Sequence, residues 1–417
     1  MIVVVGGGVA GLAAASYLAR AGRSVTVLER AADLGGRART DQLAGYALNR
    51  GIHALYTGGA ASEVLRDLGV SYRYGVPKHV IALDERGTHP FPDSPLAVMR
   101  TSLLDAGDKR ELGGMFLRLG QLRAPAYGHH SVVEWVETVA RRPRVRQLLL
   151  AIARVYVYST ALDLVSADVF ISKLQQTVKN PIHYIDGGWQ TLVDSLRDAA
   201  LSAGVTVRTS ERVSAVELAE GRAIGVRLRD GEEVPADQVV LALPPDDVLD
   251  LLPVLRPTLA EHVPAYVACL DVALSHLPAP TRPVVFDLDQ PRFMTAQSAF
   301  ARVAPGDGAV IHVFKQEITN PQRDRADLED LLDQVQAGWR EVVVQQRFLP
   351  RMLASGLLPL ASQGGLAARP AVQSEGVPSV YLAGDWVGPR GFLIDASLNS
   401  ARDAAQCILD TAVRRAA

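Results

Sequence analysis

The first residues that could do chemistry lie at the beginning of the chain, where the letters GGGVAG occupy residues 6–11. This G-x-G-x-x-G follows a short β-branched run, Ile2–Val5, and precedes a helical pattern. In such a turn Gly6 permits a tight bend, Gly8 lets the backbone approach a pyrophosphate, and Gly11 lets a helix pack against a strand. The first turn of that helix would present free N–H groups to phosphates. The stretch therefore predicts a dinucleotide site.

An acid and a second pair of glycines follow at spacings that suit the same ligand. Glu29 ends the next predicted strand, residues 24–28, about where an acid would bind a ribose hydroxyl. The chain then reads DLGGRART, in which Gly35 and Gly36 would let the backbone pass beside the pyrophosphate. The Arg37 guanidinium could offset phosphate charge. These residues extend the predicted site beyond the first loop.

A comparable strand end recurs near the C-terminus, in the stretch YLAGDWVGPRGFL at residues 381–393. A predicted strand, residues 377–383, ends in Gly384 and Asp385, and a glycine-marked loop leads into a helical pattern after Gly391. Doubly wound sheets bind ligands at the carboxyl ends of their strands. We therefore expect the two ends of the chain to form one site.

Together these motifs resemble the FAD-binding enzymes of the flavin amine oxidase, phytoene desaturase and protoporphyrinogen oxidase superfamily, whose signature has the form E-x5-G-G-R-x-x-[ST]. The resemblance covers most of the chain and implies non-covalent FAD. The residues that it implies at the cofactor are Gly6, Gly8, Val9, Ala10, Gly11, Glu29, Arg30, Gly35, Gly36, Arg37, Gly51, Ile52, His53, Val213, Gly384, Asp385, Phe392, Leu393 and Ile394.

The resemblance also implies where parts of the cofactor lie. Val213 would contact the adenine end through its backbone, and Asp385 would bind the ribityl or pyrophosphate region. The helix after Gly391 would direct its N-terminus at the flavin pyrimidine and stabilise the charge of reduced flavin. His53 would lie near the flavin, although a hydrogen-bonded core histidine is the alternative. The chain departs from the commonest family sequence at residues 395–397, which are Asp-Ala-Ser.

The implied fold is of the α/β class. It comprises a Rossmann-like FAD-binding domain with a doubly wound parallel sheet and an interleaved substrate domain of mixed β-sheet and helices. We assign residues 1–75, 184–260 and 370–417 to the FAD-binding domain, and residues 76–183 and 261–369 to the substrate-binding domain. Helical patterning over residues 95–178 predicts a cap over the flavin, and residues 325–346 predict a charged amphipathic helix.

The cap suggests an apolar substrate. Several of its side chains could line an apolar tunnel, with ordinary core packing as the alternative: Met99, Leu103, Leu104, Met115, Phe116, Leu117, Tyr156 and Tyr158. Neighbouring histidines at 129–130 lack further ligand spacing, so no metal site is predicted.

One expected catalytic group is missing from the sequence. Amine oxidases of the superfamily carry a lysine that holds a water near flavin N5, and alignment puts Ala268 at that position. Lys315 is a candidate replacement, with a strand-edge lysine as the alternative reading. His53 and Lys315 are therefore weak catalytic candidates in a reaction driven by the flavin. The missing lysine favours the desaturase-like branch over amine oxidation.

Composition sets further bounds. A net charge of −2 gives no argument for nucleic acid, and the arginine cluster at residues 141–146 is typical of a solvated helix end. Two cysteines, no signal peptide and no long apolar run predict a cytoplasmic protein whose cap could contact a membrane as a peripheral surface.

The sequence thus predicts an FAD-dependent oxidoreductase that desaturates a hydrophobic small molecule by hydride transfer to flavin N5. One alternative is oxidation of an amine or an amino-acid-derived metabolite in biosynthesis. A second is a flavoprotein without redox turnover, acting as an isomerase, cyclase or scaffold.

Overall fold

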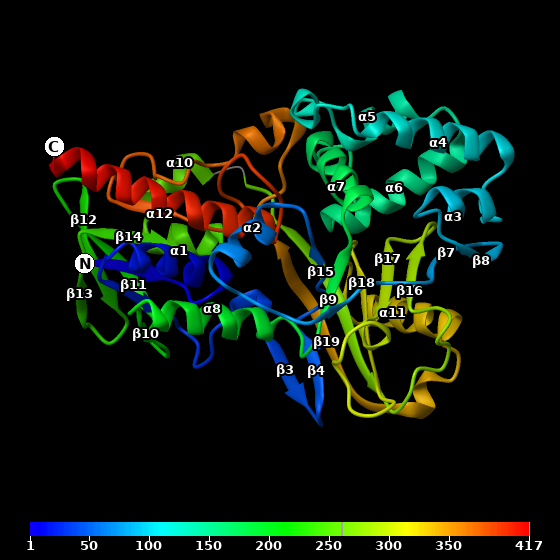
Figure 1. Cartoon of the computed structure of the whole chain (residues 1–417), viewed down its shortest axis with the longest axis horizontal. Coiled ribbons are helices and arrows are strands. Elements are labelled where there is room, and N and C mark those ends of the chain that lie inside the picture. The colour runs from blue at the N-terminus through cyan, green and yellow to red at the C-terminus, as the bar shows by residue number, and fades with distance from the viewer. Residues whose placement is uncertain (260–261, 417) are drawn as a thin grey trace.

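The computed structural model describes residues 1–259 and 262–416, and a five-stranded parallel sheet forms one end of the molecule (Figure 1). The strands run in the order β10-β2-β1-β14-β20. Their bounds are β10 Thr206–Arg208, β2 Val25–Leu28, β1 Ile2–Val5, β14 Gln238–Leu241 and β20 Val380–Leu382. Four of these strands, β1, β2, β14 and β20, are short and mostly apolar because both faces of the sheet are covered, whereas the edge strand β10 reads Thr-Val-Arg and is partly exposed.

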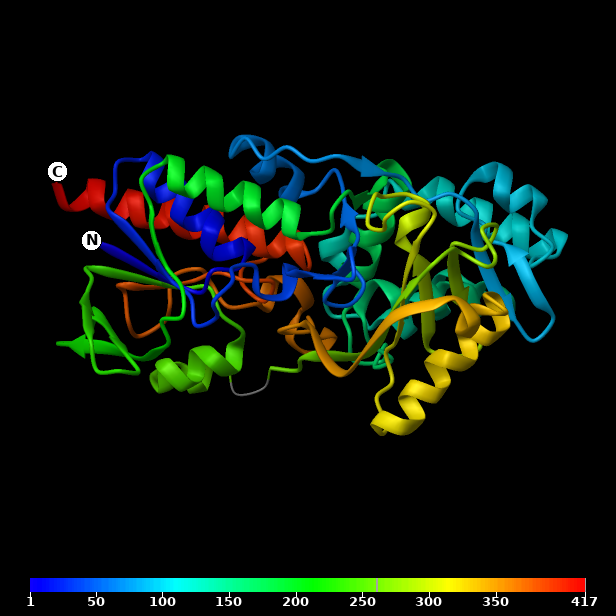
Figure 2. The same ribbon diagram turned by 90° about the horizontal axis from the view of Figure 1, so that it is seen from below.

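Helices cover one face of this sheet and a small antiparallel sheet covers the other. Figure 2 shows α1 (Val9–Arg20), α8 (Gln190–Ser202) and α12 (Ile394–Ala416) side by side. They share one apolar core with α2 (Ala60–Asp67). The opposite face packs against β11 (Val213–Ala219), β12 (Arg222–Leu228), β13 (Glu233–Pro235) and α9 (Pro245–Leu251). A short helix, α10, spans Arg256–Leu259.

A seven-stranded, mostly antiparallel sheet forms the other end of the molecule. Its order is β19-β15-β18-β17-β16-β7-β8, and only β16 and β7 pair in parallel. The bounds are β19 Val343–Ser355, β15 Ala265–Leu274, β18 Ala309–Lys315, β17 Arg292–Ala296, β16 Val284–Asp287, β7 Val80–Asp84 and β8 Gly87–Pro90. Helix α11 (Pro321–Val335) packs on one face through aliphatic side chains.

The opposite face of this sheet carries the helical cap. The cap consists of α3 (Pro95–Arg100), α4 (Ala106–Leu119), α5 (Val132–Val139), α6 (Pro143–Val157) and α7 (Ala167–Lys179). Its helices and the sheet share one apolar cluster, which we call the cap cluster; it also contains Ile52, Cys269, Phe314 and Phe392. Figure 1 shows α7 nearest the parallel-sheet unit, with α3 and α4 farthest from it.

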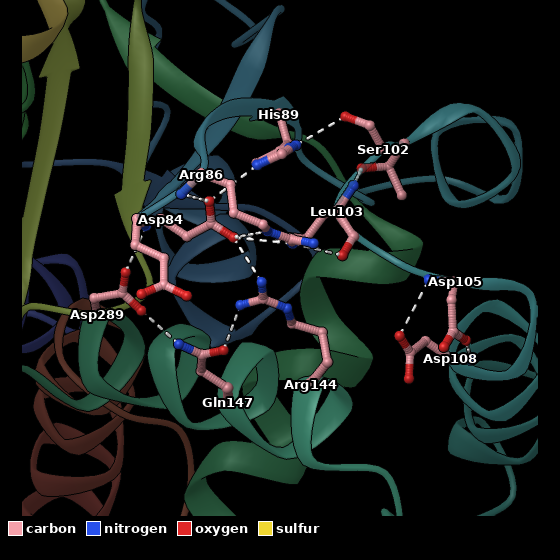
Figure 3. Close-up of polar contacts among 12 residues, drawn as sticks. Asp84, Arg86, His89, Ser102, Leu103, Asp105, Asp108, Arg144, Gln147 and Asp289 are labelled. Atoms are coloured by element: carbon pink, nitrogen blue, oxygen red, sulfur yellow. Dashed lines mark hydrogen bonds and ion pairs between the residues drawn. The ribbon is translucent and has the colours of Figure 1, made fainter.

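Buried charges fasten the cap to the sheet. The Asp84 carboxylate at the end of β7 accepts hydrogen bonds from Arg86, from His89 and, at 2.7 Å, from Arg144 on α6 (Figure 3). Asp84 has a fully buried side chain, and these partners lower its pKa against the opposing effect of burial. The prediction of a solvated helix end at residues 141–146 is therefore wrong for Arg144.

Small sheets join the two units. They consist of β3 (Thr40–Leu43) paired with β4 (Tyr46–Asn49), and of β5 (Leu55–Tyr56), β9 (Ile182–Ile185) and β6 (Tyr74–Gly75) in the order β5-β9-β6. These segments lead the chain from the parallel sheet to the seven-stranded sheet and back.

The helix predicted over residues 325–346 is wrong at both ends. Helix α11 begins at Pro321, capped by the Asn320 side chain, and ends at Val335. Gly338 then adopts a φ of +82°, which a continuing helix cannot accommodate. Residues 343–346 belong to β19, a strand of 13 residues that the sequence pattern did not reveal.

The predicted α/β fold class is confirmed, with a parallel sheet and an interleaved mixed sheet with helices. Every strand of the parallel sheet comes from the ranges assigned to the FAD-binding domain. The domain boundaries themselves stay predictions, and the one at residues 260–261 lies outside the described residues. In the described part of the chain, no helix combines the length and the apolarity needed to cross a bilayer.

Candidate cofactor and active site

The loop between β1 and α1 has the geometry that close phosphate contact requires. A Cβ on Gly11 would lie 1.9 Å from the Gly6 carbonyl oxygen, so only glycine lets α1 pack this close to the strand. At Gly8 a Cβ would meet nothing nearer than the Gly35 carbonyl oxygen, at 3.9 Å. A Cβ on Gly36 would likewise meet only the Gly8 Cα, at 3.9 Å. The two glycine segments contact each other directly, since the Gly35 N–H donates to the Gly7 carbonyl at 2.9 Å, and at Gly8 and Gly36 they present backbone without side chains.

Glu29 lies directly beside this loop. Its carboxylate accepts the N–H of Gly7 at 2.7 Å and that of Ala31 at 2.8 Å. The Glu211 N–H donates to the Glu29 carbonyl at 2.8 Å, which brings the segment leading into Val213 against the end of β2. The acid and Val213 thus lie at one end of the candidate site, where the adenosine half of a dinucleotide would be bound.

A bidentate ion pair, the Arg37–Asp385 clasp, joins the two ends of the chain. Arg37 donates from Nη1 to Asp385 Oδ2 at 2.8 Å and from Nη2 to Oδ1 at 2.6 Å. The Gly356 N–H adds a third bond to Oδ2 at 2.9 Å. Burial alone would raise the pKa of Asp385, but Arg37 and the Gly356 N–H lower it below its usual value. Asp385 therefore stays ionised in a site where it is 1% exposed.

A buried arginine that the sequence analysis missed holds the loop after Asp385. Arg369 donates to the Asp385 carbonyl at 3.0 Å and to the Gly391 carbonyl at 2.8 Å. Burial lowers the pKa of Arg369 to about 10, so it remains charged at neutral pH. Arg369 lies in an irregular segment without a motif, and nothing in the local pattern points to it. Its partners become evident only when the loop is folded.

The start of α12 lies at the boundary between the two units. Leu393 adopts a φ of +55°, a conformation that costs on the order of 1 kcal/mol outside glycine. This turn places Phe392 in the cap cluster and Ile394 in the core of the parallel-sheet unit. The positive end of the 23-residue helix therefore lies between the cofactor loops and the cap.

Gly51, Ile52 and His53 meet this boundary from the other side. A Cβ on Gly51 would lie 2.3 Å from Met352 Cε and 3.3 Å from Cys269 Sγ. The His53 ring binds the Gly51 carbonyl through Nδ1 at 3.0 Å and stacks at a tilt on Trp189, 4.6 Å between centroids. Burial lowers the pKa of His53 to about 4, so the ring is neutral at pH 7. His53 can accept or donate a hydrogen bond but carries no charge there.

The structure shows which residues of β15 face the cofactor boundary, where the lysine of amine oxidases was expected. Ala268 packs in the aliphatic core with α11, whereas Val267 and Cys269 belong to the cap cluster. Cys269, and not Ala268, is therefore the strand residue beside Gly51. Strand β15 reads AYVACLDVAL, so it offers no lysine in either register.

Two predicted residues have partners outside this arrangement. The Lys315 ammonium binds Asp324 at 3.0 Å and Asp327 at 2.5 Å, both on α11. It is thus fixed on the α11 side of the sheet, and this placement gives no support to a catalytic role. The Arg30 side chain is 55% exposed and pairs with Asp247 at 3.2 Å.

The cap side chains proposed to line a tunnel divide into two groups. Met99 and Leu117 are 73% and 82% exposed, so the expectation that they line a tunnel is wrong. Tyr156 and Tyr158 pack against the cap cluster, and Tyr158 stacks on Phe314 at 5.2 Å between centroids. Leu103, Leu104, Met115 and Phe116 also contribute to the cap cluster.

The arrangement fits a dinucleotide that extends from Glu29 to Gly51. A pyrophosphate could lie against the backbones of Gly8 and Gly36, and the Arg37 guanidinium is held at the strand ends by Asp385, which follows β20. The positive end of α12 and the neutral His53 lie at the other end, next to apolar side chains. The fold and the site together define a dinucleotide-binding protein.

Comparison with known proteins identifies the family. Residues 9–409 match the model of the flavin containing amine oxidoreductase family, so the chain belongs to that family and its cofactor is FAD. The predicted recognition is confirmed. The flavin supplies a two-electron acceptor, and the residues described above are those that would hold it.

Individual relatives are distant. The chain is 28% identical to a phytoene desaturase of Cercospora nicotianae and 23% identical to a 4,4'-diaponeurosporene oxygenase of Staphylococcus aureus, in each case over 57% of this chain. These alignments span 44% and 54% of the relatives, so the chain matches about half of their length. An oxidoreductase from Methanosarcina mazei has the same fold, with a TM-score of 0.77 at 17% identity over 97% of this chain and 99% of the other.

Proposed function

We propose that this protein is an FAD-dependent oxidoreductase that dehydrogenates an apolar small molecule, in the manner of a desaturase. The observation that carries the proposal is the cap cluster. It is continuous from Ile52 and Phe392, at the cofactor boundary, to the helices of the cap. A substrate that reaches the flavin from the cap would be surrounded by apolar and aromatic side chains.

The charge state of the boundary supports the same substrate class. His53 is neutral at pH 7, and burial raises the pKa of Tyr184 to about 12 and that of Tyr56 well above its usual value. The aromatic residues are therefore uncharged and suit an apolar ligand. Strand β15 carries no lysine to hold a water for amine oxidation.

The protein side chains would then bind the cofactor, position the substrate and exclude water. The Arg37–Asp385 clasp and the glycine loops would hold the cofactor. Phe314 and Tyr158 would form an aromatic surface against which an extended substrate could lie. The cap would exclude water while a C–H bond is oxidised.

Anaerobic reduction of the bound flavin tests this proposal. The FAD-loaded protein would be mixed with apolar polyenes in detergent, and in parallel with a panel of amines, while the absorbance of oxidised flavin is followed. We expect a polyene to bleach the flavin and the amines to leave it oxidised. Bleaching by an amine alone would favour amine oxidation. Bound flavin that no compound reduces would favour a non-redox role.

We also propose that the outer cap contacts the membrane or micelle that holds such a substrate. Leu96 and Met99 on α3 and Leu117 on α4 are 57%, 73% and 82% exposed. Exposed Arg100 and Arg110 belong to the same two helices and would suit an anionic surface. Co-flotation with anionic vesicles would support this contact, and its absence with both anionic and zwitterionic vesicles would contradict it.

A further inference from the structure

A buried lysine and a buried aspartate meet where the cap joins the cofactor domain. Lys173 on α7 and Asp395 in the first turn of α12 each have a 3% exposed side chain, and Nζ lies 3.6 Å from Asp395 Oδ2. The same ammonium donates to Gln176 Oε1 at 3.2 Å and lies 4.3 Å from the centroid of the Tyr56 ring. Burying both charges costs desolvation free energy, which their attraction offsets only when further hydrogen bonds satisfy the two groups.

The Asp395 carboxylate connects three helices. Its Oδ1 accepts the N–H of Ala61, in the first turn of α2, at 2.9 Å, and its Oδ2 accepts the Gln176 amide of α7 at 2.9 Å. A Cβ on Gly59 would lie 2.3 Å from Oδ1, so the approach of α2 depends on glycine. The N-termini of α2 and α12 both favour a negative charge at this point. Asp395 thus links α12 to both α2 and α7.

This carboxylate lies at an unfavourable place for flavin chemistry. It occupies the first turn of α12, beside the backbone of Phe392, Leu393 and Ile394. A negative charge there opposes the accumulation of further negative charge on a cofactor at the same helix end. The Lys173 ammonium is the cation that faces the Asp395 carboxylate from the cap. The other close partners of Lys173, Gln176 and Tyr56, are neutral groups.

We propose that Lys173 is a positioning residue of the cofactor site, whose ammonium neutralises Asp395 and so lets the N-terminus of α12 stabilise the reduced flavin. The inference rests on the proposed placement of the flavin at the start of α12. Because Lys173 belongs to the cap, it makes the cap part of the electrostatics of the cofactor. A cap helix would thus tune the ease with which the flavin accepts electrons.

The test compares four variants of the FAD-loaded protein. Lys173→Met removes the cation, Asp395→Asn removes the anion, and the double variant removes both. Lys315→Met is the matched control, because Lys315 is also a buried lysine between carboxylates but lies on the α11 side of the seven-stranded sheet. The midpoint potential of the flavin is measured by anaerobic dye-coupled reduction, and melting temperatures are recorded for all variants.

Lys173→Met and Asp395→Asn should shift the midpoint potential of the flavin in opposite directions. For Lys173→Met we expect reduced FAD to bind about tenfold more weakly relative to oxidised FAD, which lowers a two-electron potential by about 30 mV. Asp395→Asn should raise it, and the double variant should fall between them. Lys315→Met should lower the melting temperature and leave the potential unchanged. If the ion pair were purely structural, Lys173→Met and Asp395→Asn would both lower the melting temperature, and their flavin potentials would not shift in opposite directions.

Two results would overturn the inference, and they differ from failure of the cofactor assignment. FAD-bound single variants with the wild-type potential, or shifts in the same direction, would refute the role of Lys173. If Lys173→Met does not fold, Lys173→Gln takes its place, and a wild-type potential in that variant refutes the role of Lys173. A wild-type protein that binds no FAD would refute the cofactor site, and the inference with it.

Discussion

The two halves of the candidate site are built in different ways. The cofactor side is formed mainly by glycine backbone, as at Gly8, Gly11 and Gly36. The Arg37–Asp385 clasp joins the two ends of the chain there. On the substrate side, the contacts come from side chains of the cap and of the seven-stranded sheet. A cofactor of fixed shape can be bound by a fixed backbone, whereas a substrate site is defined by which side chains line it. The cofactor half should therefore be intolerant of small changes, and the substrate half should tolerate them.

The largest effect is expected where a single methyl group enters the glycine loop. In Gly11→Ala the new Cβ would lie 1.9 Å from the Gly6 carbonyl oxygen, so α1 must move away from β1. We expect FAD binding to be lost and the melting temperature to fall sharply. Both are measured by fluorescence titration with FAD and by thermal unfolding.

Gly8→Ala is the matched control. Its Cβ would have no neighbour nearer than 3.9 Å, so the FAD-free protein should keep its melting temperature. The methyl group should nevertheless weaken FAD binding, because it occupies the room predicted for the pyrophosphate. Gly8→Ala with wild-type affinity for FAD would show that the pyrophosphate does not pass this residue.

A smaller effect is expected from breaking the clasp between the two chain ends. Arg37→Met leaves the buried Asp385 carboxylate without its cation, which should cost about 3 kcal/mol of unfolding free energy. Adding Asp385→Asn should recover part of this loss, because the uncompensated charge is removed. Chemical denaturation at pH 7 measures both. Equal stability of Arg37→Met and the wild type would mean that the clasp is not formed in solution.

The next effect depends on pH and concerns the boundary between the halves. The pKa of His53 falls from 6.5 to about 4 on folding, so the unfolded chain binds more protons between these values. Stability from the neutral ring is complete above pH 6.5 and is lost as the pH falls towards 4. His53→Gln should reduce the stability lost between pH 6.5 and pH 4 by about 3 kcal/mol, as measured by urea denaturation at each pH. An acid limb of the same steepness in His53→Gln and in the wild type would contradict the assignment.

The smallest effect on stability is expected at the outer cap. Met99→Ser and Leu117→Ser replace exposed side chains, so each should change the unfolding free energy by less than about 0.5 kcal/mol. If the cap contacts lipid, the pair should reduce vesicle co-flotation while leaving FAD binding intact. Unchanged flotation would place the membrane contact elsewhere.

The same contrast explains what could be predicted from the sequence. The loop at residues 6–11, the acid Glu29 and the strand end at Asp385 could be predicted because each of these signals depends only on residues that are close in sequence. Arg369 and Lys173 carry no such signal, since their partners lie on segments distant in sequence. The long strand β19 was missed for a related reason: its exposed, mixed residues become a strand only by pairing with β15.

The orientation of side chains was the hardest feature to predict. The choice between Ala268 and Cys269 at the cofactor boundary depends on which face of β15 meets the cap, and an apolar strand buried on both faces has no alternation to reveal this. Met99 and Leu117 were expected inside for the same reason: apolar residue type does not distinguish a core position from an exposed one.

The most direct test of the account is a crystal structure of the protein purified with FAD. We predict electron density for the pyrophosphate against the backbones of Gly8 and Gly36, for a ribose at Glu29, and for the isoalloxazine ring between the start of α12 and Gly51. Density for FAD elsewhere, or with its ring distant from α12 and the cap cluster, would contradict the claim that the two ends of the chain form one cofactor site facing an apolar substrate region.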